Sequence, residues 1–283
     1  MYALAVTGVL LAGVVLPAKA YDSGHSVGET VFGGVSGLLF LAAGAVAHHR
    51  RPDNRVGLLM VLVGLGFFAE DVRFVPWPLP YTLGLLLGMA SSGFVAHLVL
   101  AFPTGRLESR ASRFLAAGAY LVVFGFGPLG VLFVDPAAHG QSYPPNLLLI
   151  DPSPTPLSLV RSLVFGSGSV LAAGVVVVLV RRWQAATRPR RRILAPVFGT
   201  GLVGSVASAC ASLGELDVAR VVLLTTYRVA FCLLPLAFLA GVLRVELARS
   251  GVGGLLIDLR QALSPAELRD RLAVALGDPS LRV

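Results

Sequence analysis

The chain has 283 residues, of which 55% are hydrophobic and only 13% are charged, whereas about 25% of the residues of an average soluble domain are charged. Too few polar side chains are present to cover a folded surface in water, which excludes a soluble globular protein and predicts an integral membrane protein. The formal net charge is +8, but the arginines stand in short clusters between apolar segments, which argues against a nucleic-acid partner.

Eight apolar segments are long enough, or nearly so, to cross a bilayer as helices, which takes about 20 residues each. Backbone polar groups must be paired inside hydrocarbon, and the alternating pattern of a β-barrel is absent, so these segments are predicted to be helical. The predicted spans cover residues 3–18, 30–47, 56–69, 81–102, 114–134, 159–180, 194–213 and 221–243. The predicted fold is therefore an all-α, polytopic transmembrane bundle of about eight helices in the plasma membrane, with the lipid bilayer as its first partner.

The first segment has a second interpretation. Ala18-Lys19-Ala20 has the A-x-A form of a signal-peptidase site after an apolar run. Only Met1 and Tyr2 precede that run, so the positively charged region of a secretory signal peptide is missing. An uncleaved helix is the favoured interpretation, and cleavage would leave seven spans without reversing any of them.

The connections between the predicted spans alternate in charge. Residues 48–55, 103–113 and 181–192 carry twelve arginines, whereas the intervening connections 70–80, 135–156 and 214–220 carry two and are acidic overall. Because cytoplasmic loops are enriched in arginine and lysine, the arginine-rich connections and both termini are predicted to be cytoplasmic. The predicted anchors of this topology are Arg50, Arg51, Arg55, Arg106, Arg110, Arg113, Arg181, Arg182, Arg190, Arg191 and Arg192.

The segment HLVLAFPTGR (97–106) ends a predicted span at a proline, a glycine and an arginine, which is typical of a helix that leaves the membrane. His97 lies about 8 Å inside that exit, at 1.5 Å per residue. An ionisable side chain at such a depth should face the bundle interior. We favour a neutral imidazole bonded to a neighbouring helix over a residue that senses protons or a ligand.

Arg228 lies about a third of the way into the last predicted span, counted from its acidic side. A lone arginine at a helix centre costs about 2.5 to 3.5 kcal/mol on the insertion scale, and less nearer the edge, so its apolar neighbours can offset the cost and the helix still inserts. One hypothesis pairs Arg228 with Glu70 or Asp71, at the end of the third span, or with an anionic ligand. The other lets its side chain snorkel to the nearest headgroups, and the sequence leaves both open.

Small residues recur at helical spacing in two places, at Gly33 and Gly37 and at Gly84, Gly88 and Ser92. Such small-xxx-small patterns allow two membrane helices to approach closely. We expect these contacts inside one bundle rather than between two copies of the chain.

The residues after Arg244 are of mixed charged and apolar character. Ser264-Pro265-Ala266-Glu267 forms a capping box with proline at the first helical position, so a helix is predicted to begin there and to end near Gly277. A segment of under 40 residues cannot bury a core of its own. We therefore predict a bundle over 1–244 and a cytoplasmic helical linker over 245–283, which requires further chain or a partner, such as a second copy that pairs through this tail.

No pattern in the sequence predicts catalysis. GVGG (251–254) lacks the strand and the lysine of a phosphate-binding loop, and neither an HExxH nor a GxSxG motif occurs. Cys210 and Cys232 lie inside apolar runs without metal-ligand spacing. We expect no catalytic, cofactor-binding or metal-binding residues and no cofactor.

Three stretches together resemble one protein family. RRPDNRVGLLMVLVGLG (50–66) resembles a helix start of the form R-x-P-x-N-x-hydrophobic-G, HLVLAFPTGRLESR (97–110) resembles an L-A-F-P-x-G-R-L exit, and ELRDRLAVALGDPSLRV (267–283) resembles an L-R-x-x-L-A-x-A-L-G-D-P-S-L junction. All three occur in this order in the N-terminal membrane sensor regions of actinobacterial two-component sensor histidine kinases. The resemblance covers most of the chain from about residue 26, and its third motif is the most specific.

This resemblance implies a role in two-component signal transduction. In that family the junction leads to a GAF-like module, a helix with the phosphoacceptor histidine and an ATP-binding domain. The chain ends at Val283, where the module would begin, so we expect either the truncated membrane portion of a kinase or a stand-alone sensor-like protein. Nothing in it matches the phosphoacceptor or ATP-binding motifs, so no enzymatic activity is expected of the chain by itself, and a response regulator would be reached only indirectly.

Two other classes of function remain open. A small transporter would require paired charges inside the membrane and, in many folds, an internal repeat, and no convincing repeat is present. A membrane scaffold that binds a partner would also suit a tail that cannot fold alone.

Overall fold

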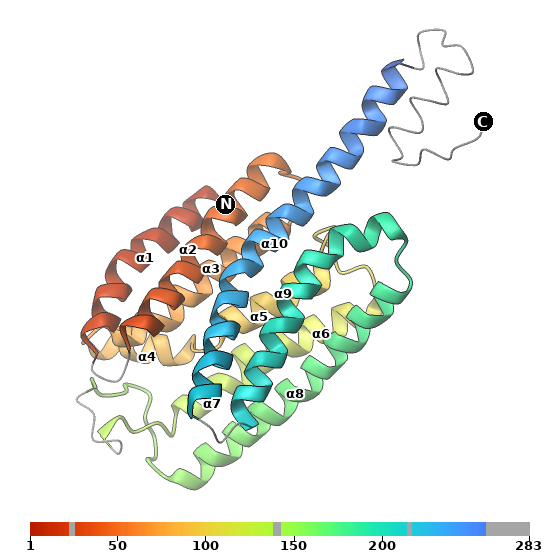
Figure 1. Cartoon of the computed structure of the whole chain (residues 1–283). Coiled ribbons are helices and arrows are strands. Elements are labelled where there is room, and N and C mark those ends of the chain that lie inside the picture. The colour runs from red at the N-terminus through yellow and green to blue at the C-terminus, as the bar shows by residue number, and fades with distance from the viewer. Residues whose placement is uncertain (23–25, 138–142, 214–216, 259–283) are drawn as a thin grey trace.

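The structure is a computed structural model that describes residues 1–22, 26–137, 143–213 and 217–258, and these residues form helices and connections without a strand. Figure 1 shows the helices side by side in one bundle. The α-helices are α1 (Tyr2–Tyr21), α2 (Val27–Arg50), α3 (Val56–Asp71), α4 (Pro78–Leu86), α5 (Ala90–Ala101), α6 (Arg110–Leu121), α7 (Gly127–Val131), α8 (Pro154–Gln184), α9 (Arg188–Leu213) and α10 (Asp217–Asp258). A 3-10 turn η1 (Val72–Phe74) follows α3, and a π-helical turn η2 (Val122–Phe126) joins α6 to α7.

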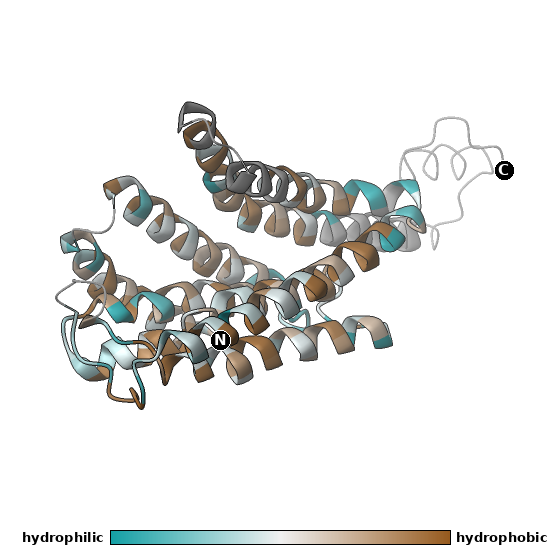
Figure 2. Ribbon diagram, turned by 90° about the horizontal axis from the view of Figure 1, so that it is seen from below, coloured by the Kyte–Doolittle hydropathy of each residue, from teal (hydrophilic) through white to brown (hydrophobic). Residues whose placement is uncertain are grey.

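Six helical stretches of the described chain are long and apolar enough to cross a membrane, which confirms the prediction of an all-α membrane bundle at this level. They are Tyr2–Tyr21, Val27–Arg50, Pro78–Ala101, Arg110–Val131, Pro154–Ala185 and Val221–Arg244. Helix α3, with 16 residues, and helix α9 are not among them. In Figure 2 the apolar residues lie along the helices and the hydrophilic ones gather toward their ends. The count of about eight spans stays a prediction.

The centre of the bundle is formed by α2, α3, α5 and α10. Phe40, Met60, Leu98 and Phe238 are fully buried there and belong to one apolar cluster. Helices α2 and α3 cross at contact distance, because a Cβ atom at Gly44 would lie 2.8 Å from the carbonyl oxygen of Gly57. Lipid tails are as apolar as leucine, so this close packing, rather than exclusion from water, stabilises the contact.

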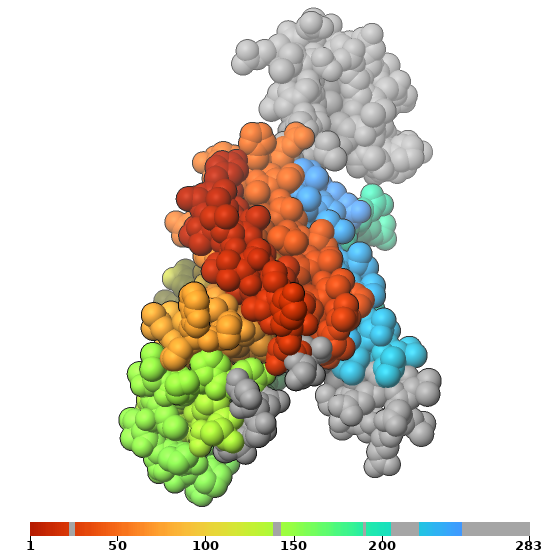
Figure 3. Space-filling model, turned by 90° about the vertical axis from the view of Figure 1, so that its left-hand side faces the viewer, coloured from red at the N-terminus to blue at the C-terminus, as the bar shows by residue number. Residues whose placement is uncertain are grey.

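Helix α1 lies on the outside of α2 and α3 (Figure 3), and its Ala12 and Val15 are buried against them. Two of the small residues predicted to allow close approach, Gly37 and Gly84, do so within this chain. A Cβ atom at Gly37 would lie 2.6 Å from the Phe68 ring, and one at Gly84 would collide with the backbone of Arg73 in η1.

The predicted span 81–102 is not one continuous helix, because α4 ends at Leu86 and α5 begins at Ala90. A carboxylate oxygen of Glu70 accepts a hydrogen bond of 2.7 Å from the backbone N–H of Ser91, in the first turn of α5. This bond satisfies one of the N–H groups that a helix start leaves unpaired. Helix α4 instead lies at the ends of α1, α2 and α3 (Figure 1) and packs against η1.

The predicted span 114–134 contains the π-helical turn η2 directly before Gly127 and Pro128. Pro128 has no backbone N–H to bond the carbonyl of Phe124, four residues before it, so the regular α-helical ladder is interrupted there. The helix still continues to Val131.

Helix α10 is 42 residues long and passes through Arg244 without a break. It contacts α9 and α2 within the bundle, and Figure 1 shows its C-terminal part extending beyond the other helices. Pro235 lies inside it and does not end it. Residues 245–258 of the predicted linker belong to α10, while the rest of that linker, with the predicted helix after Ser264, lies outside the described residues.

Candidate functional site

The three arginine-rich connections meet at one end of the bundle, which we call the arginine-rich end. Asn54 donates a hydrogen bond of 3.0 Å to the carbonyl of Pro103, which joins the first connection to the second. Arg182 donates to the Ser112 hydroxyl at 3.0 Å, which joins the third to the second. Arg244 of α10 donates to the carbonyl of Arg192 at 2.7 Å.

The predicted anchors fall into two groups in the structure, those bonded to the backbone and those that are exposed. Arg182 and Arg191 donate to backbone carbonyls, Arg182 at the end of α5 and Arg191 at the end of α8. Arg106, Arg110 and Arg181 are exposed. The side chain of Arg190 lies outside the described residues.

The turn Phe102-Pro103-Thr104-Gly105 is a folded unit that contacts two other parts of the chain. Gly105 has φ +74°, and a Cβ atom there would collide with the Asn54 carboxamide, so the turn requires glycine. The same carboxamide accepts a bond of 3.0 Å from the N–H of Val56, at the start of α3. The stretches RRPDNRVG and AFPTGR, which the sequence presents as separate motifs, therefore form one contact.

The acidic connections lie at the opposite end of the bundle, and we call it the acidic end. Lys19 of α1 and Asp71 of α3 form an ion pair at 2.9 Å, with side chains only 12% and 11% exposed. The Lys19 ammonium also lies 5.1 Å from the centroid of the Phe74 ring. Glu70 caps α5, as described above, so both carboxylates that were candidate partners of Arg228 have other partners.

Arg228 of α10 pairs with Glu29 of α2, at 2.7 Å between Nη2 and Oε1. The hypothesis that paired Arg228 with Glu70 or Asp71 is therefore wrong, because the carboxylate that Arg228 contacts belongs to α2. The two side chains are 28% and 41% exposed. Glu29 is also the acidic residue of a capping box with Ser26 at the start of α2, which fixes its position. The S-x-x-E pattern of residues 26–29 is the sequence signal that could have predicted the position of Glu29 at this helix start.

Further contacts hold α10 against the bundle between its two ends. The Cys232 thiol lies 3.0 Å from the Ser36 hydroxyl of α2. Nearer the arginine-rich end, the rings of Phe102 and Phe238 meet edge to face with centroids 5.1 Å apart. A Cβ atom at Gly241 would collide with the Phe102 ring. Helix α10 thus contacts the same turn that Asn54 and Gly105 build.

His97 of α5 bonds through Nδ1 to the Tyr120 hydroxyl of α6, at 2.8 Å. This is the bond to a neighbouring helix that the structural interpretation expected. The rings of His97 and Tyr120 also meet edge to face, with centroids 5.7 Å apart.

The connection after α7 covers part of the acidic end. Tyr143 stacks on Tyr81 of α4, with ring centroids 5.6 Å apart, and its hydroxyl donates to the Asp22 carboxylate at 3.1 Å. Partial burial raises the pKa of Tyr143 above its ordinary value, and the negative charge of Asp22 raises it further. The phenol therefore remains a donor at neutral pH. Among the described residues, no three His, Cys, Asp or Glu side chains gather as metal ligands would.

These features define an all-helical protein with several helices suited to a membrane and a long helix that connects its two ends. None of the known protein families, curated proteins or solved structures with which the chain was compared matches it. The resemblance to sensor kinases therefore stays a prediction that depends on the three sequence motifs.

Proposed function

We propose that this chain is the membrane-embedded input region of a two-component sensor histidine kinase and that α10 is its output helix. The observation that carries the proposal is the continuity of α10 from Asp217 to Asp258, through the arginine-rich end of the bundle. A change at the acidic end would reach the residues that follow the bundle without crossing a flexible connection. The receiver would be a cytoplasmic kinase core that this chain does not contain.

In this proposal, a stimulus shifts the balance between two placements of α10 against the bundle. A stimulus acts only through contacts that differ between the two states. Two contacts of α10 are suited to this: the Arg228–Glu29 pair at the acidic end and the packing of Phe238 and Gly241 on Phe102 at the other. The ion pair is partly exposed, so its rearrangement would cost little compared with a repacking of the buried aromatic contact.

The proposal is tested by joining residues 1–283 to a soluble histidine kinase core and measuring autophosphorylation in membranes. We expect Glu29→Gln to change the rate at least threefold, and an insertion of three glycines after Arg244 to remove that difference. Arg161→Ala is the matched control, because Arg161 lies in α8, remote from α10 in sequence, and its side chain is exposed. Equal rates for the parent, Glu29→Gln and the glycine insertion would refute the proposal.

The same proposal includes the location and partners predicted from the sequence. The arginine-rich end faces the cytoplasm of a plasma-membrane protein, and both termini lie on that side. The tail beyond α10 pairs with a second copy, and a response regulator is reached only through the kinase core. The charge asymmetry between the two ends of the bundle supports this orientation.

A small transporter is a second candidate, because one observation favours it. The segment Pro78–Ala101 is interrupted, and the start of α5 receives a carboxylate from another helix, as in transporters with discontinuous helices. Reconstituted vesicles would separate the two candidates. A proton or ion flux that Glu70→Gln abolishes would favour transport, and tight vesicles would favour the input region.

A further inference from the structure

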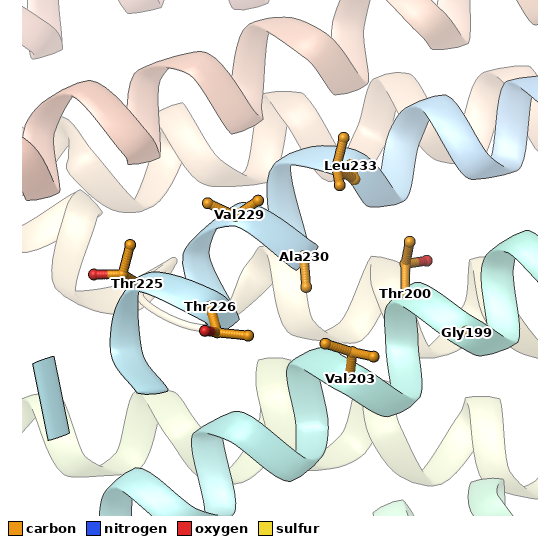
Figure 4. Close-up of a pocket in the computed structure, with 8 residues that line it drawn as sticks. All are labelled: Gly199, Thr200, Val203, Thr225, Thr226, Val229, Ala230 and Leu233. Atoms are coloured by element: carbon orange, nitrogen blue, oxygen red, sulfur yellow. The ribbon is translucent and has the colours of Figure 1, made fainter. Parts of the chain in front are cut away.

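The surface of α9 and α10 is hollowed by a groove of about 390 Å³ (Figure 4). Three residues of α9 and five of α10 line it, among them Gly199 and Val203 on one side and Val229 and Leu233 on the other. Val203, Val229 and Leu233 are 51%, 43% and 46% exposed, so no other described part of the chain covers these side chains. A Cβ atom at Gly199 would meet nothing within 4 Å.

The groove offers almost no hydrogen-bonding groups to an occupant. Thr200 donates to the carbonyl of Pro196 at 2.8 Å, Thr225 to that of Val221 at 2.8 Å and Thr226 to that of Val222 at 2.9 Å. Each hydroxyl proton is thus held by the threonine's own helix, and the methyl groups and valine side chains form the wall. An occupant would be recognised by its apolar surface and by its width.

The position of the groove indicates where an occupant would come from. All five lining residues of α10 belong to the stretch Val221–Arg244, which is long and apolar enough to cross a membrane. From Thr225 to Leu233 the groove follows about 12 Å of helix, at 1.5 Å per residue. A partner helix of about 10 Å diameter would occupy about 900 Å³ over that length. A helix of that diameter would lie across the rims of the groove without filling it, whereas one hydrocarbon chain is narrow enough to lie along its floor.

We propose that one hydrocarbon chain of a membrane lipid occupies the groove between α9 and α10. Surrounding lipid tails are as apolar as the groove, so tight packing rather than exclusion from water would hold the chain. The lipid headgroup takes no part in the binding. Because α10 forms one wall, occupancy bears on the placement of that helix, but the binding itself is independent of the proposed kinase function.

The test is native mass spectrometry of the full chain in a mild detergent, with dioleoyl phosphatidylcholine or dioleoyl phosphatidylglycerol added as the probe. Gly199→Leu places a side chain into the groove without a clash, since its Cβ meets nothing. We expect this variant to lower the fraction of protein that retains its first lipid at least threefold, equally for both lipids. Gly199→Ala, which fills less of the groove, should give a smaller loss.

Gly201→Leu on the same helix and Gly166→Leu on α8 are the matched controls. Each of these glycines also has nothing within 4 Å of its Cβ position, and neither lines the groove. Both controls should retain lipid like the parent chain, and thermal unfolding would confirm that all variants are folded. Three results would overturn the proposal: unchanged retention in Gly199→Leu, retention of only the anionic lipid, or a dimer of the parent chain that Gly199→Leu dissociates.

Discussion

Two ion pairs at the acidic end differ in how far the rest of the protein covers their side chains. The Lys19–Asp71 side chains are 12% and 11% exposed, whereas those of Arg228 and Glu29 are 28% and 41% exposed. Removing one partner of a buried pair leaves an uncompensated charge, which is strongly destabilising. The Arg228 and Glu29 side chains are near enough to the acidic end to turn toward headgroups and water when one of them is replaced, so this pair contributes little.

We therefore expect Asp71→Asn to lower the free energy of unfolding by about 3 kcal/mol, and Glu29→Gln to lower it by less than about 1 kcal/mol. Titration of the purified variants with a denaturing detergent would measure both values. Equal losses would mean that the difference in exposure does not govern the two pairs.

Gly105 provides a second comparison between single residues. Gly105→Ala would force an L side chain to φ +74° and against the Asn54 carboxamide, so we expect a loss of about 2 kcal/mol. Gly168→Ala should stabilise α8 by up to about 1 kcal/mol, because a Cβ there meets nothing within 4 Å and alanine favours the helix. Thermal unfolding in detergent measures both changes, and a loss in Gly168→Ala or none in Gly105→Ala would contradict these assignments.

For single residues, the sequence predicted how deep a side chain lies in a membrane span better than which neighbouring helix it faces. The position of Arg228 within the last apolar segment left a paired side chain and a snorkelling one equally open. The pattern of one segment does not show which neighbouring helix its side chain faces, so Glu29, 199 positions away, was missed. Asn54 and Gly105 were present in recognised motifs, but their mutual contact depends on packing between distant turns.

At the scale of helices, most apolar segments coincide with observed helices, because length and hydropathy are properties of each segment alone. The exceptions have particular causes. The break between α4 and α5 depends on Glu70 from another helix, which bonds the N–H of Ser91. The π-helical turn before Pro128 has a local cause, because proline interrupts the α-helical ladder but does not determine the type of helix that results.

The packing of α10 on α2 can be tested through its native thiol. The Cys232 sulfur lies 3.0 Å from the Ser36 hydroxyl, so Ser36→Cys in a Cys210→Ala background should form a disulfide with Cys232 on mild oxidation. Loss of both free thiols from the monomer, counted by alkylation and mass spectrometry, is the expected result. Ser169→Cys on exposed α8 should keep its thiols free, and the same result for Ser36→Cys would contradict the observed packing.

At the scale of the whole molecule, the arginine-rich and acidic connections lie at opposite ends of the bundle. The alternation of charge could be predicted because the net charge of a connection depends only on the residues of that connection. The side of the membrane that each end faces follows only from the positive-inside rule.

Single cysteines introduced at Gln184 and Ile150 test that orientation. Both side chains are exposed, Gln184 at the arginine-rich end and Ile150 in the connection before α8. In a background without the native cysteines, a membrane-impermeant maleimide added to intact cells should label Ile150→Cys and leave Gln184→Cys unlabelled until the cells are opened. The reverse pattern would invert the proposed topology.

Because α10 is unbroken, a tilt of this helix about the contact between Phe102 and Gly241 would move its two ends in opposite directions. Asp258 lies 17 residues beyond this point, about 25 Å along the axis, and Arg228 lies 13 residues before it, about 20 Å away. A rocking movement of about 5° would displace both positions by about 2 Å in opposite directions. A displacement of that size away from α2 would take the Arg228 guanidinium beyond hydrogen-bonding distance of Glu29, so the proposed movement of α10 would couple the loss of this ion pair to a shift of Asp258.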